Sequence, residues 1–582
     1  MRKLYFLVVS SLFLIGCQKD GPGALLTAKG DEAFDNYKDH YLEALWKVSP
    51  DKAAGEGYHK YDSILVIPND KGREAIINFV KTQQDSLSRF EVNDLTEPNK
   101  IDYRILQNQL EYTNWQQTVL KPWQFNAGYY NPVPAFAHIL NESYAPLAKR
   151  LRNLHQKMAS LPQYYKEAEK VLKDAVPELT ALAIDQQTAG LNIIDRDFID
   201  SIKKANLPAA EQKQMTDRAN LATAAMRMHI AWLKAVKSDK PRSFRLGKAL
   251  YEEKFKYEMQ SALTAQQLFN TATERKKQIH KDMAKLSRQL WPKYMGKKTI
   301  PADSLAMIAQ VLDTISANHT TAANFQSSIE DMLPKLSTFV KEKDLLTLDP
   351  SKRLLVRKSP AYFGNVAGAS LSAPGPYDKN ANSYYNILSL TGMSTEKAQS
   401  YLREYNNYTL QILSIHEAIP GHYAQLVYAN KAPSMIKSIF SSGPMVEGWA
   451  VYGEEMMLDA GYDPSPEMKL MWYKWHLRSV CNAILDYAVH CNNMSQESAL
   501  KFLTQDAFQQ QAEAEGKWKR VSLTSVQLCS YYLGYKEIVD LRDAYKIKTG
   551  ATKYKLKEFN EKFLSYGSAP VKLIRTAMLG NK

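Results

Sequence analysis

Apolar residues recur at helical spacing along most of this 582-residue chain. In the stretch 31–47, the side chains of Phe34, Tyr37, Tyr41 and Leu42 follow this spacing and share one helix face. Similar patterns predict further helices over 70–91, 98–119, 144–170, 207–236, 264–290, 303–313 and 320–342. Stretches that contain proline separate several of these segments, as is typical of connections between helices. We therefore predict a large, mostly α-helical fold.

One region departs from the helical pattern. The short apolar segments 353–357, 366–371 and 384–388 are separated by turn residues, among them the Pro-Gly-Pro at 374–376. They predict a small β-sheet immediately before the helix that carries His416. In helical zinc peptidases, an edge strand beside the metal can bind the backbone of the substrate. A purely structural hairpin is the alternative interpretation.

Three helices are predicted around this histidine. The first is capped by Ser394 and runs through His416. The second begins at the Gly-Pro pair 443–444, where proline suits the first helical turn, and ends at Gly461. The third covers 466–495, and its dense aromatic residues indicate core packing.

The residues that are candidates for catalysis or metal binding lie in and between the first two of these helices. The segment from His416 to His422 reads His-Glu-Ala-Ile-Pro-Gly-His, and the triplet Glu-Gly-Trp follows at 447–449. Two imidazoles with an adjacent and a downstream carboxylate are the parts of a hydrolytic zinc site. The familiar helical signature separates its histidines by four residues. A separation of six turns an ideal helix through about 600°, which leaves the two rings about 120° apart.

Two residues inside the segment offer a way to correct this geometry. Pro420 has no N–H, and its ring would clash with the carbonyl of His416 four residues back. Gly421 can adopt backbone angles that are closed to other residues. A break at this point would bring His422 back toward His416. The alternative is an ordinary helix end with two unrelated histidines.

The residue types assign roles within such a site. His416, His422 and Glu447 would hold one zinc ion and leave its fourth position open. Glu417 is too close to its neighbour to share the metal, so it is the candidate general base. Glu454 lies seven residues after Glu447, on nearly the same helix face. It either orients a histidine or is an ordinary surface residue.

The N-terminus has the pattern of a targeting segment. A basic start is followed by an apolar stretch, 4–15, that is too short to span a bilayer. The sequence Leu-Ile-Gly-Cys at 14–17 resembles the lipobox of bacterial lipoproteins. It predicts a signal peptide over 1–16, lipidation of Cys17 and a tether over 17–30. A plain secretory signal is the alternative. Residues 31–582 would form the main domain.

Two further expectations concern location and partners. The Gln-Lys-Asp at 18–20 resembles an export tag of Gram-negative lipoproteins, which predicts the outer membrane or cell surface. The membrane is thus an expected partner, through the lipid anchor. The net charge of +14 is spread along the chain, without a Gly-rich phosphate loop, so we expect no nucleic-acid binding. The sequence assigns no oligomeric state.

The motif resembles that of a large bacterial family known as domain of unknown function 885. The resemblance continues in C-terminal blocks at Gln527, Ser530, Tyr531, Gly534, Ile538, Leu541, Arg542, Phe563, Gly567 and Pro570. This chain departs from the family pattern in two places. Tyr423 stands where the family often has a second histidine, and Ser-Val at 525–526 stands where it tends to have Pro-Gly.

The resemblance implies a helical, two-lobed fold with a deep cleft, related to zinc peptidases of the gluzincin type. It implies the same ligands and base as above, with Tyr531 as the donor to the developing oxyanion. The leading hypothesis is a zinc-dependent hydrolase of peptide bonds that acts on short peptides at the cell envelope. One alternative is an envelope binding or structural lipoprotein with a vestigial metal site. Another is a zinc amidase that acts on non-peptide amides.

Overall fold

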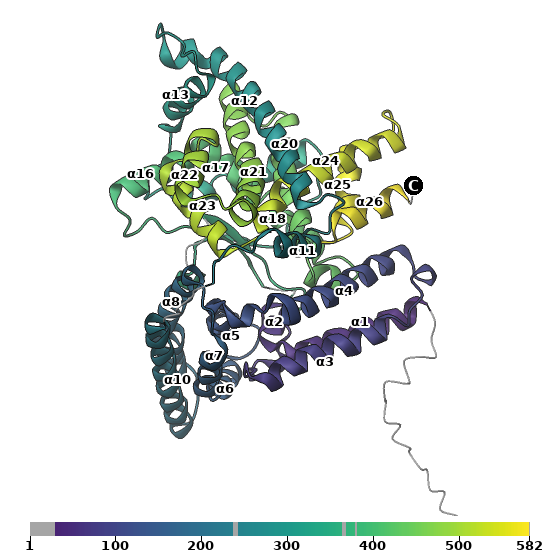
Figure 1. The fold of residues 1–582 in the computed structure, drawn as a ribbon, viewed down its shortest axis with the longest axis vertical. Coiled ribbons are helices and arrows are strands. Elements are labelled where there is room, and N and C mark those ends of the chain that lie inside the picture. The colour runs from purple at the N-terminus through teal and green to yellow at the C-terminus, as the bar shows by residue number, and fades with distance from the viewer. Residues whose placement is uncertain (1–29, 237–241, 364–367, 379–380, 581–582) are drawn as a thin grey trace, which may run out of the picture.

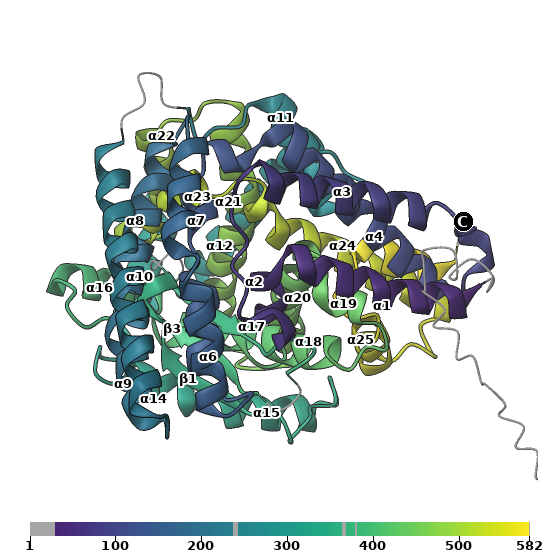
Figure 2. The ribbon, with the colours of Figure 1, turned by 90° about the horizontal axis from the view of Figure 1, so that it is seen from below.

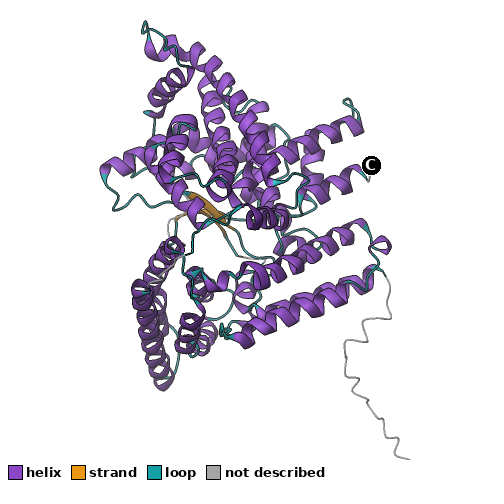
Figure 3. Cartoon of the chain, in the orientation of Figure 1, coloured by secondary structure: helices purple, strands orange, loops and turns teal. Residues whose placement is uncertain are grey.

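The computed structural model describes residues 30–236, 242–363, 368–378 and 381–580. These residues are mostly helical and contain one small sheet, which confirms the predicted fold class (Figure 3). The predicted signal peptide, the lipidation of Cys17 and all but the last residue of the tether lie outside the described residues. Within them, no helix is both long enough and apolar enough to cross a membrane.

The N-terminal part of the chain forms two groups of helices. Its elements are α1 (Asp31–Val48), α2 (Pro50–Gly55), α3 (Asp70–Leu87), α4 (Glu97–Trp115), α5 (Val133–Asn141), α6 (Leu147–Met158), α7 (Leu161–Val171), α8 (Pro177–Asn192), α9 (Phe198–Lys204) and α10 (Ala209–Ala235). Figures 1 and 2 show α1, α3 and α4 together on one side and α8 and α10 on the other. Helices α5 to α10 enclose a hydrophobic core of their own.

The remaining helices build the larger part of the molecule. They are α11 (Lys248–Met259), α12 (Ala265–Met295), α13 (Ser304–Ser316), α14 (Phe325–Glu330), α15 (Leu333–Glu342), α16 (Thr395–Glu404), α17 (Asn407–Glu417), α18 (His422–Ala429), α19 (Met435–Ile439), α20 (Gly443–Asp459), α21 (Pro466–Cys491), α22 (Gln496–Lys501), α23 (Gln511–Leu523), α24 (Ser530–Thr549), α25 (Leu556–Leu564) and α26 (Val571–Leu579). Their largest hydrophobic core extends to α1, α3 and α4.

Several predicted helices are in fact pairs of shorter ones. The segments 144–170 and 320–342 are each divided, and Pro162 and Pro334 lie in the first turn of the second helix, where proline is favoured. The helix predicted from Ser394 through His416 is also divided, between α16 and α17. The side chain of Asn406 caps the start of α17 by accepting two backbone N–H groups.

The small sheet lies where the sequence predicts it. Its strands are β1 (Leu354–Lys358), β2 (Ala369–Ser372) and β3 (Ser383–Ile387), in the order β1-β3-β2. Strand β1 pairs with β3 in parallel, and β2 pairs with β3 in antiparallel register, with Leu371 opposite Tyr385. Strand β2 is thus an edge strand, and it packs beside α17.

Helices α20 and α24 cross with their backbones in direct contact. A Cβ atom at Gly534 would lie 1.8 Å from the carbonyl oxygen of Pro444, and one at Gly448 would lie 2.3 Å from the carbonyl carbon of Gly534. Only glycine fits at these two positions, because any side chain would force the helices apart. This contact fixes α20, which carries Glu447, against α24, which carries Tyr531.

Candidate metal centre

The break in the motif follows the end of α17. Helix α17 ends at Glu417 and α18 begins at His422, so the four residues between them form an irregular turn. The N–H of Gly421 donates to the carbonyl oxygen of Ile415 at 3.0 Å. A Cβ atom at Gly421 would lie 1.9 Å from the carbonyl oxygen of His416, so the turn requires glycine here.

Helix α20 holds this turn in place. The indole N–H of Trp449 donates to the carbonyl oxygen of Pro420 at 2.9 Å, and the Trp449 side chain is fully buried. The ring of Trp449 stacks on Phe563, with ring centroids 5.8 Å apart. The tryptophan of the Glu-Gly-Trp triplet therefore supports the break, and the C-terminal part of the chain supports the tryptophan.

The break brings both histidines and the downstream glutamate together. The ring centroids of His416 and His422 are 4.7 Å apart, and the ring planes are inclined by 85°. The Oε2 atom of Glu447 lies 3.3 Å from Nε2 of His422 and 3.7 Å from Nε2 of His416. This oxygen nevertheless accepts no hydrogen bond from any described residue. Three potential ligand atoms thus converge without bonding to one another.

The far side of His416 is held by Glu454. Nδ1 of His416 lies 2.7 Å from Oε1 of Glu454, and the indole N–H of Trp475 donates to the same oxygen at 2.9 Å. Glu454 is fully buried rather than exposed on the surface. A carboxylate bonded to Nδ1 fixes the imidazole so that Nε2 faces Glu447, which is the usual support of a metal-binding histidine.

Glu417 is the other carboxylate at this point. One of its oxygens lies within 4.8 Å of a ring nitrogen of both His416 and His422. The side chain is buried, and its Oε2 has no hydrogen-bond partner among the described residues. Glu417 and His416 also line a cavity of about 210 Å³. Glu417 is therefore placed to act on a molecule in that cavity.

Tyr531 packs beside the ring of His416. The two rings are nearly parallel, at 18°, with centroids 6.2 Å apart. Arg520 donates to the hydroxyl oxygen of Tyr531 at 2.8 Å and to Oε1 of Gln527 at 2.9 Å. Gln527 in turn donates to Oε1 of Glu447 at 3.5 Å. Sequence reasoning missed Arg520, because nothing in the pattern of α23 distinguishes this arginine from a surface cation.

The two departures from the family pattern have local explanations. Tyr423 points away from the histidines, and its hydroxyl donates to the carbonyl oxygen of Lys352 at 2.9 Å. Val526 adopts φ +70°, a left-handed conformation that favours glycine over a β-branched residue. The buried carboxylate of Asp486 stabilises this turn by accepting the backbone N–H groups of Val526 and Leu528 at 2.9 and 3.1 Å.

The charges in the cluster are those of a cation site. Burial lowers the pKa of His416, but the neighbouring Glu447 and Glu454 outweigh it and raise that pKa to about 10. Burial raises the pKa of Glu447, but the two imidazoles outweigh it, and the net pKa is well below its usual range. Three carboxylates thus lie around two imidazoles, and a divalent cation would offset two of their three negative charges.

The two distances from Glu447 to the histidines suit the spacing of zinc ligands. Tetrahedral zinc with bonds of about 2.0–2.2 Å places its ligand atoms about 3.3–3.6 Å apart. The distances of 3.3 and 3.7 Å from Oε2 of Glu447 to the two Nε2 atoms agree closely with that spacing. Two imidazoles and one carboxylate are also a ligand set of catalytic zinc sites, which keep one position open.

With the fold and this cluster established, the chain can be placed among known proteins. It belongs to the family described as bacterial proteins of unknown function, DUF885, whose model matches residues 50–578. A solved structure of a candidate lipoprotein of unknown function from Shewanella oneidensis is 45% identical in sequence. Its TM-score is 0.83, and the match covers 94% of this chain and 99% of the other.

A second solved structure, of a candidate lipoprotein from Colwellia psychrerythraea, is 15% identical and has a TM-score of 0.75. The match covers 94% of this chain and 98% of the other, and it shows a shared fold. No curated protein matches this chain.

Proposed function

We propose that this protein is a zinc-dependent hydrolase of peptide bonds, with His416, His422 and Glu447 as the metal ligands. The observation that carries the proposal is the convergence of two imidazole nitrogens on an otherwise unbonded carboxylate oxygen, at zinc-ligand spacing. Zinc bound in such a site activates water and polarises a substrate carbonyl.

The remaining side chains have the roles that amide hydrolysis needs. Glu417 is buried beside the cavity with a free carboxylate oxygen, so it can accept a proton from the attacking water and pass it to the leaving amine. Burial raises the pKa of Tyr531 to about 12, although Arg520 opposes the shift. The hydroxyl therefore stays protonated at neutral pH and can donate to the developing oxyanion.

The surroundings of the site suit a peptide. The cavity beside Glu417 is also lined by Gly368 and Ala369, at the start of the edge strand β2. An edge strand can bind an extended peptide through backbone hydrogen bonds. The volume of about 210 Å³ is smaller than the roughly 300–1,000 Å³ typical of pockets for drug-sized ligands. A short peptide or the end of a chain is therefore the proposed substrate.

The proposed location is the cell envelope of a Gram-negative bacterium. The lipobox-like sequence that ends at Cys17 supports a lipid anchor, and the two solved relatives are described as candidate lipoproteins. The Gln-Lys-Asp that follows Cys17 supports the outer membrane or cell surface in particular. The membrane and a peptide are thus the proposed partners.

Metal analysis tests the proposed function directly. Protein purified without chelator is expected to contain about one zinc per chain, because the site offers three ligands and one open position. Removing the metal should abolish hydrolysis of a mixture of short peptides, and added zinc should restore it. Protein that lacks zinc and hydrolyses no peptide would favour a binding lipoprotein. Cleavage confined to non-peptide amides would identify an amidase.

Glu454→Gln is expected to weaken zinc binding about 10- to 100-fold, because the variant loses the carboxylate that orients His416. Zinc competition with a chromogenic chelator measures this change. Glu455→Gln is the matched control, since Glu455 is next in the sequence but accepts its hydrogen bond from Tyr535 instead. Equal zinc affinities in the two variants would contradict the role of Glu454.

A further inference from the structure

One side of the cavity beside the candidate metal centre has basic side chains that have no role in the proposed hydrolysis. Helix α23 presents Glu513, Gly516, Lys517 and Arg520 to the cavity. These positions are spaced by three, four and seven residues from the first, so they share one helix face. The centre itself forms another part of the lining, through His416, Glu417 and Tyr531.

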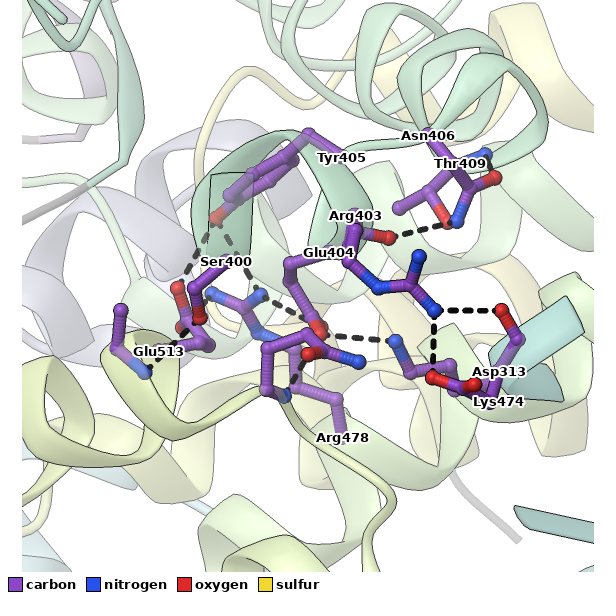
Figure 4. Close-up of polar contacts among 12 residues, drawn as sticks. Asp313, Ser400, Arg403, Glu404, Tyr405, Asn406, Thr409, Lys474, Arg478 and Glu513 are labelled. Carbon is purple, nitrogen blue, oxygen red and sulfur yellow. Dashed lines mark hydrogen bonds and ion pairs between the residues drawn. The ribbon is translucent and has the colours of Figure 1, made fainter. Parts of the chain in front are cut away.

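Two neighbouring cations are already matched by carboxylates. A guanidinium nitrogen of Arg478 lies 2.5 Å from Oε1 of Glu513, and the ammonium of Lys474 lies 2.8 Å from Oε2 of Glu404 (Figure 4). The hydroxyl of Tyr405 donates to Glu513 and accepts from Arg478, and a second guanidinium nitrogen of Arg478 lies 4.0 Å from Oε1 of Glu404, which connects the two pairs. These four charged groups form a closed network of hydrogen bonds and ion pairs and need no further partner.

Lys517 is not matched in the same way. Its side chain is 2% exposed, and its ammonium approaches only Glu513, at 3.9 Å. It makes no hydrogen bond to any residue in the described part of the chain. Burial, together with Arg478, lowers the pKa of Lys517 well below its usual range. A carboxylate bound beside Lys517 would favour the charged form of this buried amine, because an ammonium group is costly to bury without a close partner.

Arg520 adds a second uncompensated charge. It donates to the neutral side chains of Tyr531 and Gln527, and no carboxylate of a described residue lies within 4.0 Å of it. The lining of the cavity includes three basic residues, Arg478, Lys517 and Arg520, and Glu513 is the carboxylate that pairs with Arg478. The carboxylates of Glu417 and Glu447 lie beside the two imidazoles, where a bound zinc ion would offset their charge. The cavity is therefore suited to an anion.

We propose that Lys517 and Arg520 bind a carboxylate of the peptide substrate in this cavity. The inference rests on the proposed function, and it specifies that the hydrolase selects peptides with a carboxylate near the bond that is cut. Arg520 contacts the hydroxyl of Tyr531 at 2.8 Å, and the Tyr531 ring lies 6.2 Å from the ring of His416. Successive residues of a peptide are about 3.8 Å apart. The carboxylate thus belongs within about one or two residues of the bond that is cut.

Two sources of this carboxylate share the same chemistry. It is either the α-carboxylate at the end of the peptide, which would make the protein a carboxypeptidase, or the side chain of an acidic residue. Gly516 leaves room for either, because a Cβ atom built there meets nothing within 4 Å. The experiment therefore has one arm for each source.

The first experiment compares matched peptides with the zinc-loaded, full-length protein. One pair differs only in a free or amidated C-terminus, and the other pair differs only in Glu or Gln next to the cut bond. A hydrogen-bonded charge in one member of a pair should raise kcat/KM about 10- to 100-fold over the neutral member. Preference within the first pair identifies the α-carboxylate, and preference within the second identifies the side chain. Equal rates in both pairs overturn the proposal.

Variants test whether α23 carries this preference. Lys517→Met should reduce the preferred-to-neutral ratio about tenfold or more, whereas a merely structural loss would lower both rates equally. Lys519→Met, two residues along and exposed, is the matched control and should keep the ratio. Gly516→Leu is a second variant, which fills the opening while leaving every charge in place, and it should raise KM for the preferred peptide. An unchanged ratio in Lys517→Met and an unchanged KM in Gly516→Leu would contradict the assignment.

Calorimetry separates this inference from the proposed function. The free-acid and amidated peptides, and the Glu and Gln peptides, are titrated into a Glu417→Gln protein, which binds without turning over. Tighter binding of a charged peptide, by about tenfold or more, supports the carboxylate site even if no peptide is hydrolysed. Hydrolysis by the wild type without any such difference in binding would leave the proposed function standing and overturn the inference.

Discussion

Glu417→Gln is expected to lower kcat for peptide hydrolysis about 10²- to 10⁴-fold, because the amide cannot accept the proton of the attacking water. The variant should retain its zinc, since Glu417 is not one of the three proposed ligands. Hydrolysis rates measured together with zinc content by atomic emission check both parts of this expectation.

His422→Ala provides the contrast to this variant. It removes a proposed ligand, so it should lose both zinc and activity. The two variants together separate proton transfer from metal binding. A Glu417→Gln protein that hydrolyses peptides at the wild-type rate would rule out Glu417 as the general base.

Gly421→Ala is expected to destroy the metal site and to lower the free energy of unfolding by about 3 kcal/mol or more. The added Cβ would lie 1.9 Å from the carbonyl oxygen of His416, which is fixed by the end of α17. The turn would have to open, and His422 would move away from His416. Zinc content and the midpoint of thermal unfolding measure the two effects.

Gly55→Ala is the matched control for the glycine variant. A Cβ atom at Gly55, the last residue of α2, meets nothing within 4 Å. Alanine is therefore expected to change stability by less than about 1 kcal/mol and to leave zinc content unchanged. Normal zinc content in Gly421→Ala would show that the two histidines do not depend on this turn.

The sequence predicts the helices well because apolar spacing reports local structure. The stretches 31–47, 207–236 and 264–290 correspond to α1, α10 and α12 within a few residues. Helix boundaries inside longer apolar patterns are harder to predict. They depend on single residues, such as Asn406, whose side chain caps the start of α17. Apolar periodicity is unaffected by such a cap, so the pattern continues across the break.

The residues of the candidate site also fall into two groups, those that local sequence predicts and those that only the fold brings to the site. The motif places His416, Glu417 and His422 within seven residues, so local sequence is enough to propose them. Lys517 and Arg520 lie about a hundred residues further on, and only tertiary packing brings α23 to the cavity. Their charge alone carries no such information, because most lysines and arginines are solvated surface residues.

The backbone contact between α20 and α24 has a consequence for how the candidate metal centre can diversify. With no side chain between Gly448 and Gly534, the backbones of the two helices pack directly against each other. These helices carry Glu447 and Tyr531, so the crossing sets the separation of the two residues, and Arg520 of α23 adds a hydrogen bond to Tyr531. A residue of α23 that does not contact Tyr531, such as Lys517, can therefore be exchanged to change what the cavity binds while Glu447 and Tyr531 keep their places.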